Sequence, residues 1–553
     1  MTAKSSRSFR AIRCLAGLVL VAGLGCTLND SDEEADRARR PDKGGRLTIS
    51  IRAPESIEPS RASERLGLLV LKQICEPLVT ADPSTGELRP GAAASWEIAP
   101  DAKKVTFRLR PGLKFHNARE VVAQDYVYSL SRFAHKDTGS RQYFLLDRVG
   151  GYKELRESGA ATLSGVKAPE AHVLEIELTE PFAELPAVLA HPGAGSAVPK
   201  EEIDKGAEAF AARPMCTGPY AVSAPWDRTQ PLTLKRVSGY RGDNPAFSSK
   251  GAGVADELVF KIVADAAAGY EDLNKKQADI AEVPIDQLAQ ARKVRGRVQS
   301  AANGVEVFIG LPVTKAPFDN LQFRRALALG LDRNEVVEKL LAGSREIPTG
   351  FLSPAAGPAG KAHKCDQTVL PSSDSKLAKE ALTASAVDPA ATPLKLHFNA
   401  GSGHEKWLEM VGAHWQASLG VASTLAPHDP PFASYLDYLV EGADGPFRWA
   451  WPTTYPSPEA IFGPTFAGGS PDNYSRFSSP AFEEALKKAR ATVDTEDRVK
   501  AYTDAGEILC NELPMLPVWN VQNHWAFAAE VASASNKRLD TFAEPILREL
   551  GRS

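Results

Sequence analysis

Residues 74–133 read ICEPLVTADPSTGELRPGAAASWEIAPDAKKVTFRLRPGLKFHNAREVVAQDYVYSLSRF, and this stretch contains both kinds of apolar periodicity that separate the fold classes. Within it, residues 105–110 place an apolar side chain at every second position, which predicts a half-buried β-strand. Further along, Tyr126, Leu130 and Phe133 stand at i, i+4 and i+7, which predicts one apolar face of a helix. The stretch therefore predicts a strand followed by a helix.

The same two patterns recur on either side of this stretch. Residues 47–51 and 174–178 alternate as residues 105–110 do and are predicted strands. Toward the other end, Ser479 with Pro480 begins one predicted helix, and Asp494 begins a second helix that ends at Pro514. Because helical and strand patterns are interspersed, the predicted fold class is α/β.

Length and charge limit the organisation and the partners of the chain. A chain of 553 residues is too long for one ordinary core and predicts two or three lobes of about 100–200 residues each. The 65 basic and 69 acidic side chains give a net charge of −4, which offers no basic surface for nucleic acid or for an anionic membrane. We therefore expect no nucleic-acid partner.

The N-terminus predicts export. Residues 14–25 form an uncharged apolar run, too short to span the roughly 30 Å of a bilayer and typical of a signal peptide, and four cations precede it: Lys4, Arg7, Arg10 and Arg13. The run ends at Gly25 and Cys26, which resembles the bacterial lipobox with its lipidated cysteine, although Gly23 stands where that motif usually has leucine. Residues 1–25 are the predicted signal peptide, and an incidental Cys26 with ordinary cleavage remains the alternative.

Residues 26–43 follow as a predicted flexible tether, because they are charged and lack apolar periodicity. The tether would join a lipidated Cys26 to the folded part of the chain.

Four further cysteines, Cys75, Cys216, Cys365 and Cys510, allow three disulfide connectivities in an oxidising compartment, and buried free thiols are the alternative.

No nucleophile elbow, HExxH motif or phosphate-binding loop is present. His404, His414 and His428 are too irregularly spaced to form a metal-ligand set on one element. We therefore expect neither an enzyme nor a bound cofactor or metal.

Residues 74–133 as a whole resemble the signature region of the extracellular solute-binding proteins of peptide ABC transporters. Shorter matches follow in the same order: VLAHPGAGSAVPKE at 188–201, TGPY at 217–220, PFDNLQFRRALALGLDRNEVVEKLLAG at 317–343, NY at 473–474 and LPMLPVW at 513–519. The resemblance covers roughly residues 44–530. A series of motifs in order is more specific than any single one.

The resemblance implies a two-lobe periplasmic-binding-protein-like fold of type II, in its large cluster C form with an extra subdomain. Lobe I with the inserted subdomain would take residues 44–300, lobe II residues 301–509, and residues 510–545 would return to lobe I. It also implies a monomer that captures a peptide or peptide-like solute between the lobes and delivers it to a membrane permease.

The stretch FRWAWPTTYPSPEAIF, residues 447–462, resembles the aromatic cleft wall of that family. The resemblance implies contact roles for Trp451 and Tyr455, and Trp449 is a further candidate; for both tryptophans a core position is the alternative. Prolines in this stretch should hold the backbone extended and exclude a helix.

Thr454 stands where the family has an aspartate that pairs with the α-ammonium of a peptide. Glu76, in the match to another cleft element, is the candidate substitute, with a solvated or structural carboxylate as the alternative. Tyr143 is a weaker candidate for the same wall.

Three functions remain open. A peptide-binding protein of an importer comes first. A binding protein of the same fold with a changed ligand, such as a metal chelate, a glycan or a signal, or with a sensing role, comes second because of Thr454. A hydrolase comes last, since no nucleophile and base can be identified.

Overall fold

The computed structural model describes residues 44–238, 240, 253–366, 373–533 and 537–552. These residues contain a large sheet of eleven strands, in which β13 (Arg345–Glu346) pairs with β17 beside the main path. Along that path the strands are β15 (Ser423–His428), β14 (Leu394–Asn399), β16 (Phe447–Pro452), β12 (Val298–Gly310), β17 (Met515–Phe527), β11 (Ile280–Glu282), β1 (Arg46–Ile51), β10 (Glu257–Ile262), β9 (Leu232–Arg236) and β8 (Tyr220–Val222).

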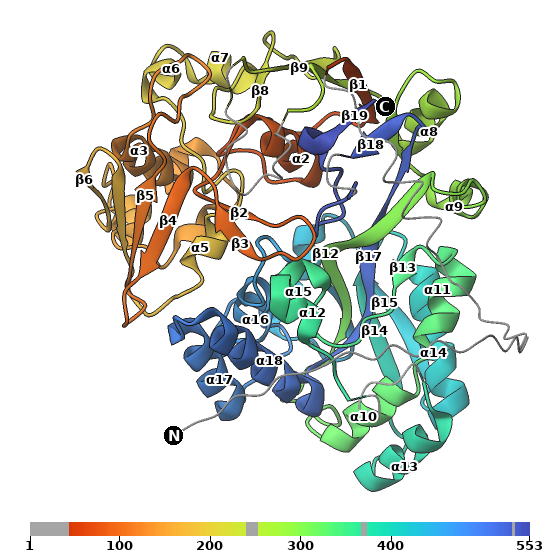
Figure 1. The fold of residues 1–553 in the computed structure, drawn as a ribbon. Coiled ribbons are helices and arrows are strands. Elements are labelled where there is room, and N and C mark those ends of the chain that lie inside the picture. The colour runs from red at the N-terminus through yellow and green to blue at the C-terminus, as the bar shows by residue number, and fades with distance from the viewer. Residues whose placement is uncertain (1–43, 239, 241–252, 367–372, 534–536, 553) are drawn as a thin grey trace, which may run out of the picture. The chain divides into compact units, whose positions relative to one another are not determined.

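Two long antiparallel strands, β12 and β17, join the two halves of this sheet. They lie side by side in Figure 1. In the order of the sheet, β16, β14 and β15 follow beyond β12, and β11, β1 and β10 follow beyond β17. Their pairing shifts register between Ala302 and Glu306, where Gly304 takes a φ of +87° that only glycine adopts without strain. The predicted boundary between residues 300 and 301 falls inside β12, and the domain limits stay a prediction.

A smaller antiparallel sheet has the order β4 (Ala93–Ile98), β5 (Lys104–Leu109), β7 (Val173–Glu177) and β6 (Val166–Glu170). Helix α3 (Ala123–Ala134) packs against β6 and β7 with Tyr126, Leu130 and Phe133 buried. The strands predicted at 47–51, 105–110 and 174–178 are thus confirmed as β1, β5 and β7, and the predicted helix is confirmed as α3.

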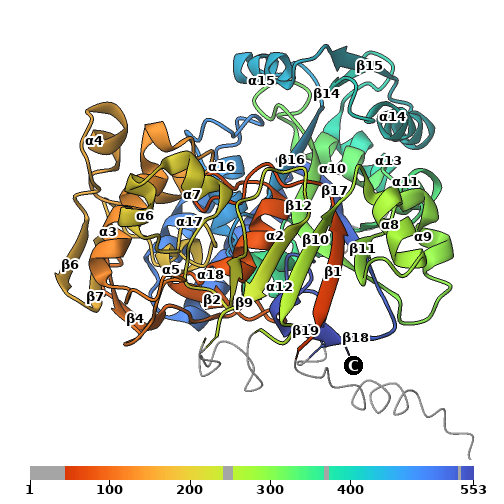
Figure 2. The same ribbon diagram turned by 90° about the horizontal axis from the view of Figure 1, so that it is seen from above.

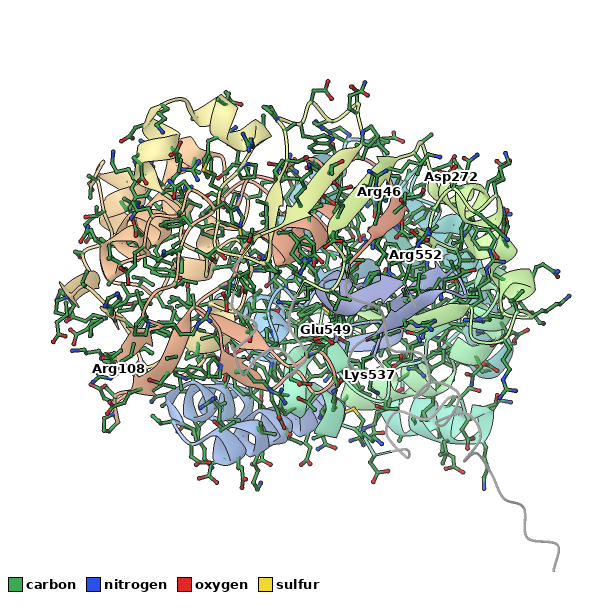
Figure 3. All side chains as sticks on the ribbon, turned by 45° about the horizontal axis from the view of Figure 1, so that its top comes forward. Arg46, Arg108, Asp272, Lys537, Glu549 and Arg552 are labelled. Atoms are coloured by element: carbon green, nitrogen blue, oxygen red, sulfur yellow. A yellow bond between two sulfur atoms is a disulfide. The ribbon has the colours of Figure 1, made fainter. Side chains whose placement is uncertain are left out.

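The described residues also contain two two-stranded antiparallel sheets, β2 (Val79–Ala81) with β3 (Leu88–Pro90) and β18 (Val531–Ser533) with β19 (Leu550–Arg552). The C-terminal strand returns to the beginning of the fold, because β19 contacts β1 and the Arg552 guanidinium lies 2.6 Å from the Asp279 carboxylate. Figure 3 labels Arg552 on β19 and Arg46 on β1.

Helix ends follow local capping rules. Helix α17 (Pro480–Ala491) begins after Ser479, whose hydroxyl accepts the Phe482 amide. Helix α18 (Thr495–Glu512) begins after Asp494, and both predicted helices are thus confirmed. The other helices of at least eight residues are α2 (Arg65–Ile74), α8 (Ala266–Asn274), α10 (Leu321–Leu329), α11 (Arg333–Leu341), α13 (Ser375–Ser385), α14 (Glu405–Leu419), α15 (Phe432–Glu441) and α16 (Glu459–Phe466).

Shorter helices cover other connections. They are α4 (Tyr152–Glu157), α5 (Leu185–Val188), α6 (Lys200–Asp204), α7 (Ala207–Ala212), α9 (Ile285–Ala291), α12 (Gly357–Ala362) and the 3₁₀ turns η1 (Lys136–Thr138), η2 (Tyr143–Leu146), η3 (Pro354–Ala356) and η4 (Leu547–Glu549).

One expectation about residues 447–462 is wrong. The stretch begins as strand β16, but helix α16 starts at Glu459 and includes the last four residues of the stretch. Proline is tolerated at the beginning of a helix, where its missing N–H would be unpaired in any case. Pro458 therefore precedes a helix instead of preventing one.

Disulfides join Cys75 to Cys216 and Cys365 to Cys510, which selects one of the three connectivities and rules out the free-thiol alternative. Cys75 follows α2, and Cys510 lies in α18. Each bond closes a long loop, with separations of 141 and 145 residues.

Candidate ligand-binding site

A cavity of about 300 Å³ lies where several parts of the chain that are distant in sequence meet. Its lining residues come from residues 63–83 around α2, from Gln142, from 190–192, from 303–305 in the middle of β12, from 452–456 at and beyond the end of β16, and from 540–548 near the C-terminus. The volume is at the lower end of the range of about 300–1,000 Å³ that small-molecule sites have.

The register shift in β12 positions one wall of this cavity. The Thr453 amide donates to the Gly304 carbonyl oxygen at 2.7 Å. The segment that follows β16 is therefore bound to the part of β12 where the register shifts. Beyond it, the Trp451 indole N–H donates to the Ala460 carbonyl at 2.7 Å and joins the strand to the first turn of α16. Residues 452–456 are therefore anchored at both ends.

Thr454 and Tyr455, two of the predicted site residues, line the cavity. Thr454 is half-buried, whereas Tyr455 is 6% exposed and also belongs to the core around the small sheet. Burial, with Glu459 nearby, raises the pKa of the Tyr455 phenol well above its ordinary value, so its hydroxyl stays protonated.

Neither of the two predicted tryptophans is among the lining residues of the cavity. Trp449 is buried and packs edge-on against Tyr474 with ring centroids 4.8 Å apart. Trp451 is partly buried and packs against the hydrophobic core that contains Trp449 and Tyr474. Any contact of either ring with a ligand stays a prediction.

Glu76 and Tyr143 also lie outside the lining. The Glu76 carboxylate is buried, 2.6 Å from the Arg110 guanidinium, and accepts the Tyr240 hydroxyl at 3.0 Å. The Tyr143 ring lies under the Arg156 guanidinium, 3.7 Å from it. Their neighbours in the sequence do reach the cavity: Cys75, Pro77 and Gln142.

Residues 540–548 form a wall of the cavity that was not predicted from the sequence. The Asp540 carboxylate lies 2.6 Å from the Lys72 ammonium of α2 and accepts the amides of Phe542 and Glu544. The Lys72 ammonium lies 5.1 Å from the centre of the Phe542 ring. Residues 510–545 are expected from the sequence to return to lobe I, but no motif within them indicates a cavity wall.

A second acidic group of the cavity, Glu544, is also paired. One of its oxygens lies 2.9 Å from the Arg65 guanidinium and accepts the Asn523 side-chain amide at 2.8 Å, while Arg65 also contacts Glu282. Burial raises the pKa of Glu544 to about 7, although Arg65 acts in the opposite direction. Each carboxylate among the described lining residues is therefore already bound to a cation of α2.

His191 adds a neutral imidazole to the lining. Its Nδ1 accepts the amides of Gly193 and Ala194 at 3.1 and 3.2 Å, which places the proton on Nε2. Burial, assisted by Lys72, lowers the pKa of His191 to about 3, so the ring carries no charge at neutral pH.

One set of three potential metal ligands occurs among the described residues, His363 with Cys365 and Cys510. Both sulfur atoms belong to the disulfide, so neither is a thiolate that could bind a metal. The set lies outside the cavity lining.

The signal peptide, Cys26 and the tether lie outside the described residues. Among the residues that are described, no helix combines the length and the apolar character needed to cross a bilayer.

The chain matches a known family over most of its length. The profile of the bacterial extracellular solute-binding proteins, family 5, matches residues 87–473. The periplasmic oligopeptide-binding protein OppA of Haemophilus influenzae is 27% identical over 85% of this chain and 87% of its own length. The dipeptide-binding protein of Escherichia coli K12 is 26% identical over 78% and 81%, and a probable deoxycholate-binding periplasmic protein, YgiS, of the same organism is 24% identical over 84% and 86%.

Solved structures show the same fold. The unliganded open form of the murein tripeptide-binding protein MppA superposes with a TM-score of 0.78 at 22% identity, over 93% of this chain and 98% of that chain. Haemophilus influenzae OppA in complex with the peptide RPPGFSPFR gives a TM-score of 0.66 at 23% identity, over 93% and 100%. By the match to its profile, the chain belongs to the bacterial extracellular solute-binding proteins of family 5, and it has their two-lobe periplasmic-binding-protein fold.

Proposed function

We propose that this protein captures peptides or peptide-like solutes in the cavity beside Thr454 and delivers them, chemically unchanged, to the membrane permease of an ABC importer. Membership of family 5 and the relatives named for oligopeptide and dipeptide binding support the importer. The protein would act as an exported monomer, held at the membrane by a lipid on Cys26.

The pairing of the two cavity carboxylates limits the ligand. Asp540 is bound by Lys72 and Glu544 by Arg65, and Thr454 contributes only a neutral hydroxyl. A peptide α-ammonium that lost its water here would lack a free counter-charge among the described lining residues, and an uncompensated buried charge is costly. The ligand is therefore a peptide with a blocked N-terminus, or a solute with amide groups and no free ammonium at this position.

A second candidate keeps the fold and changes the ligand class, to a metal chelate, a glycan or a signalling molecule, with or without transport. Thr454 in the cavity is the observation that favours it. One relative is named as a probable deoxycholate-binding periplasmic protein, so the proteins similar to this chain are not all named for peptide binding.

Mass spectrometry of the natural ligand separates the two candidates. The exported protein is purified, gently unfolded, and the released small molecules are identified; we expect one class that contains amide bonds and lacks a free α-amine. Ala190→Phe places a ring in the cavity lining and should reduce the released ligand, whereas Ala161→Phe, at an exposed position, should not. A released ligand without amide bonds would replace the first candidate by the second.

A further inference from the structure

Two histidines meet on neighbouring strands, outside the cavity lining. Strands β14 and β15 are parallel and pair Asn399 with His428, so His397, two residues before Asn399, has its side chain on the same face as His428. Nδ1 of His397 lies 3.1 Å from Nε2 of His428. Figure 2 shows β14 and β15 together with α15, which contacts β14.

The Asp444 carboxylate lies beside Nε2 of His397, the ring nitrogen that does not face His428. Oδ1 of Asp444 lies 2.9 Å from Nε2 of His397 and accepts the Tyr438 hydroxyl at 2.7 Å. The Asp444 amide in turn donates to the Tyr438 oxygen at 3.1 Å. Nε2 of His397 faces the Asp444 carboxylate, which favours a proton on Nε2 and leaves the lone pair of Nδ1 on the side of His428.

The ring of Tyr438 covers both imidazoles. Its centroid lies 4.6 Å from that of His397 and 4.2 Å from that of His428. Asp444, whose side chain is 57% exposed, places the pair next to solvent.

The separation of the two nitrogens fits a chelate. Two metal–imidazole bonds of about 2.0–2.1 Å, the length known for zinc, to nitrogens 3.1 Å apart enclose an angle of about 95–100° at the metal. Such an angle suits neighbouring positions of a tetragonal or octahedral cation, the geometry of Cu²⁺ and Ni²⁺ with nitrogen and oxygen ligands.

We propose that His397 and His428 chelate a divalent transition-metal cation, Cu²⁺ or Ni²⁺, through Nδ1 and Nε2 respectively. Asp444 is the positioning residue that fixes the tautomer and orientation of His397, and water molecules complete the coordination. Without metal, Nε2–H of His428 donates to Nδ1 of His397. On binding, that proton passes through water to Nδ1 of His428, so the ring stays neutral and no net proton is released.

Calorimetry and electron paramagnetic resonance test this site. The full exported chain, treated with EDTA and dialysed, is titrated with Cu²⁺ alone; we expect one equivalent whose spectrum shows coupling to two nitrogens. Asp444→Asn, at the exposed end of the group, should weaken binding about 10- to 100-fold, the usual effect of removing the partner of a metal-bound histidine. His428→Gln should weaken it further and remove one nitrogen from the spectrum.

His414→Gln is the matched control, because His414 also lies beside a carboxylate, Glu335 at 3.0 Å. This variant should bind Cu²⁺ as the wild type does. Equal affinity of the wild type and Asp444→Asn for Cu²⁺ would overturn the proposal. A wild-type spectrum without coupling to two nitrogens would overturn it as well. If His428→Gln fails to fold, the affinity of Asp444→Asn alone tests the site.

Discussion

Nζ of Lys72 lies 2.6 Å from Oδ2 of Asp540, so helix α2 is bound to a segment 468 residues further along the chain. The two side chains are 21% and 15% exposed. Oδ1 of Asp540 also accepts the amides of Phe542 and Glu544 at 2.9 and 3.0 Å. One carboxylate thus fixes a wall of the cavity and neutralises one of its cations.

Asp540→Asn should destabilise the protein by about 1–3 kcal/mol, because the substitution removes a charge-assisted hydrogen bond and leaves the Lys72 ammonium partly buried without its partner. The free energy of unfolding is measured by urea denaturation of the purified protein. A stability equal to that of the wild type would mean that the pair is as weak as one on the open surface.

Asp504→Asn is the control for this variant. Asp504 pairs with Lys500 at 2.8 Å on the exposed face of α18, where water screens the interaction. Its denaturation midpoint should be indistinguishable from that of the wild type.

Buried Glu306 should make stability fall as pH rises. Its carboxyl group lies on β12 opposite Trp451 and accepts the Ser353 amide, and burial raises its pKa to about 8. Between the ordinary pKa of about 4.3 and this value, the native state holds a proton that the unfolded chain has lost. Each pH unit in this window should therefore reduce stability by up to about 1.4 kcal/mol through this group.

Glu306→Gln, which cannot titrate, should abolish this contribution, so the difference in unfolding free energy between variant and wild type should change steadily from pH 5 to pH 8. Glu87→Gln, at an exposed position, is the control substitution of the same kind. Parallel stability curves for Glu306→Gln and the wild type would show that Glu306 does not retain its proton in the folded protein.

Cys26 lies outside the described residues, and lipidation stays a prediction. Each buried methylene of an acyl chain contributes about 0.8 kcal/mol, and two or more chains are needed for stable anchoring. The exported wild type should partition into the membrane fraction, and Cys26→Ala should move it to the soluble fraction. A wild type that is soluble without detergent would exclude the lipid anchor.

Local elements could be predicted from sequence because their causes are local. Ser479 with Pro480 defines the start of α17, and the alternation at 105–110 defines β5, without any knowledge of distant residues. The end of the aromatic stretch was harder, since Pro458 is compatible both with an extended loop and with the start of a helix.

The cavity could be predicted only in part. Thr454 and Tyr455 were identified because they lie in one continuous stretch that resembles the family. Lys72 and Asp540 became neighbours only through the tertiary return of the C-terminus, and His397 and His428 only through the pairing of β14 with β15. No spacing within the sequence carries that information.

Thr454→Asp tests what the cavity recognises. Thr454 lines the cavity, and an aspartate there would supply the carboxylate that Asp540 and Glu544, both paired, do not offer. The wild type should bind N-acetylated and free-amine forms of one peptide about equally, or prefer the blocked form. The variant should shift the preference toward the free amine by about 1.5–3 kcal/mol, or roughly ten- to a hundred-fold in affinity.

Calorimetric titration of matched peptide pairs at low and moderate salt measures this preference. Thr454→Asn has a similar shape and no charge, so it should behave as the wild type does. Glu76→Gln should also leave the preference unchanged, because Glu76 lies outside the lining and is bound to Arg110 and Tyr240. A wild type that already favours the free amine about a hundred-fold, ~2.7 kcal/mol, would show that another carboxylate binds the ammonium. Loss of that preference in Glu76→Gln would then identify Glu76 as that carboxylate.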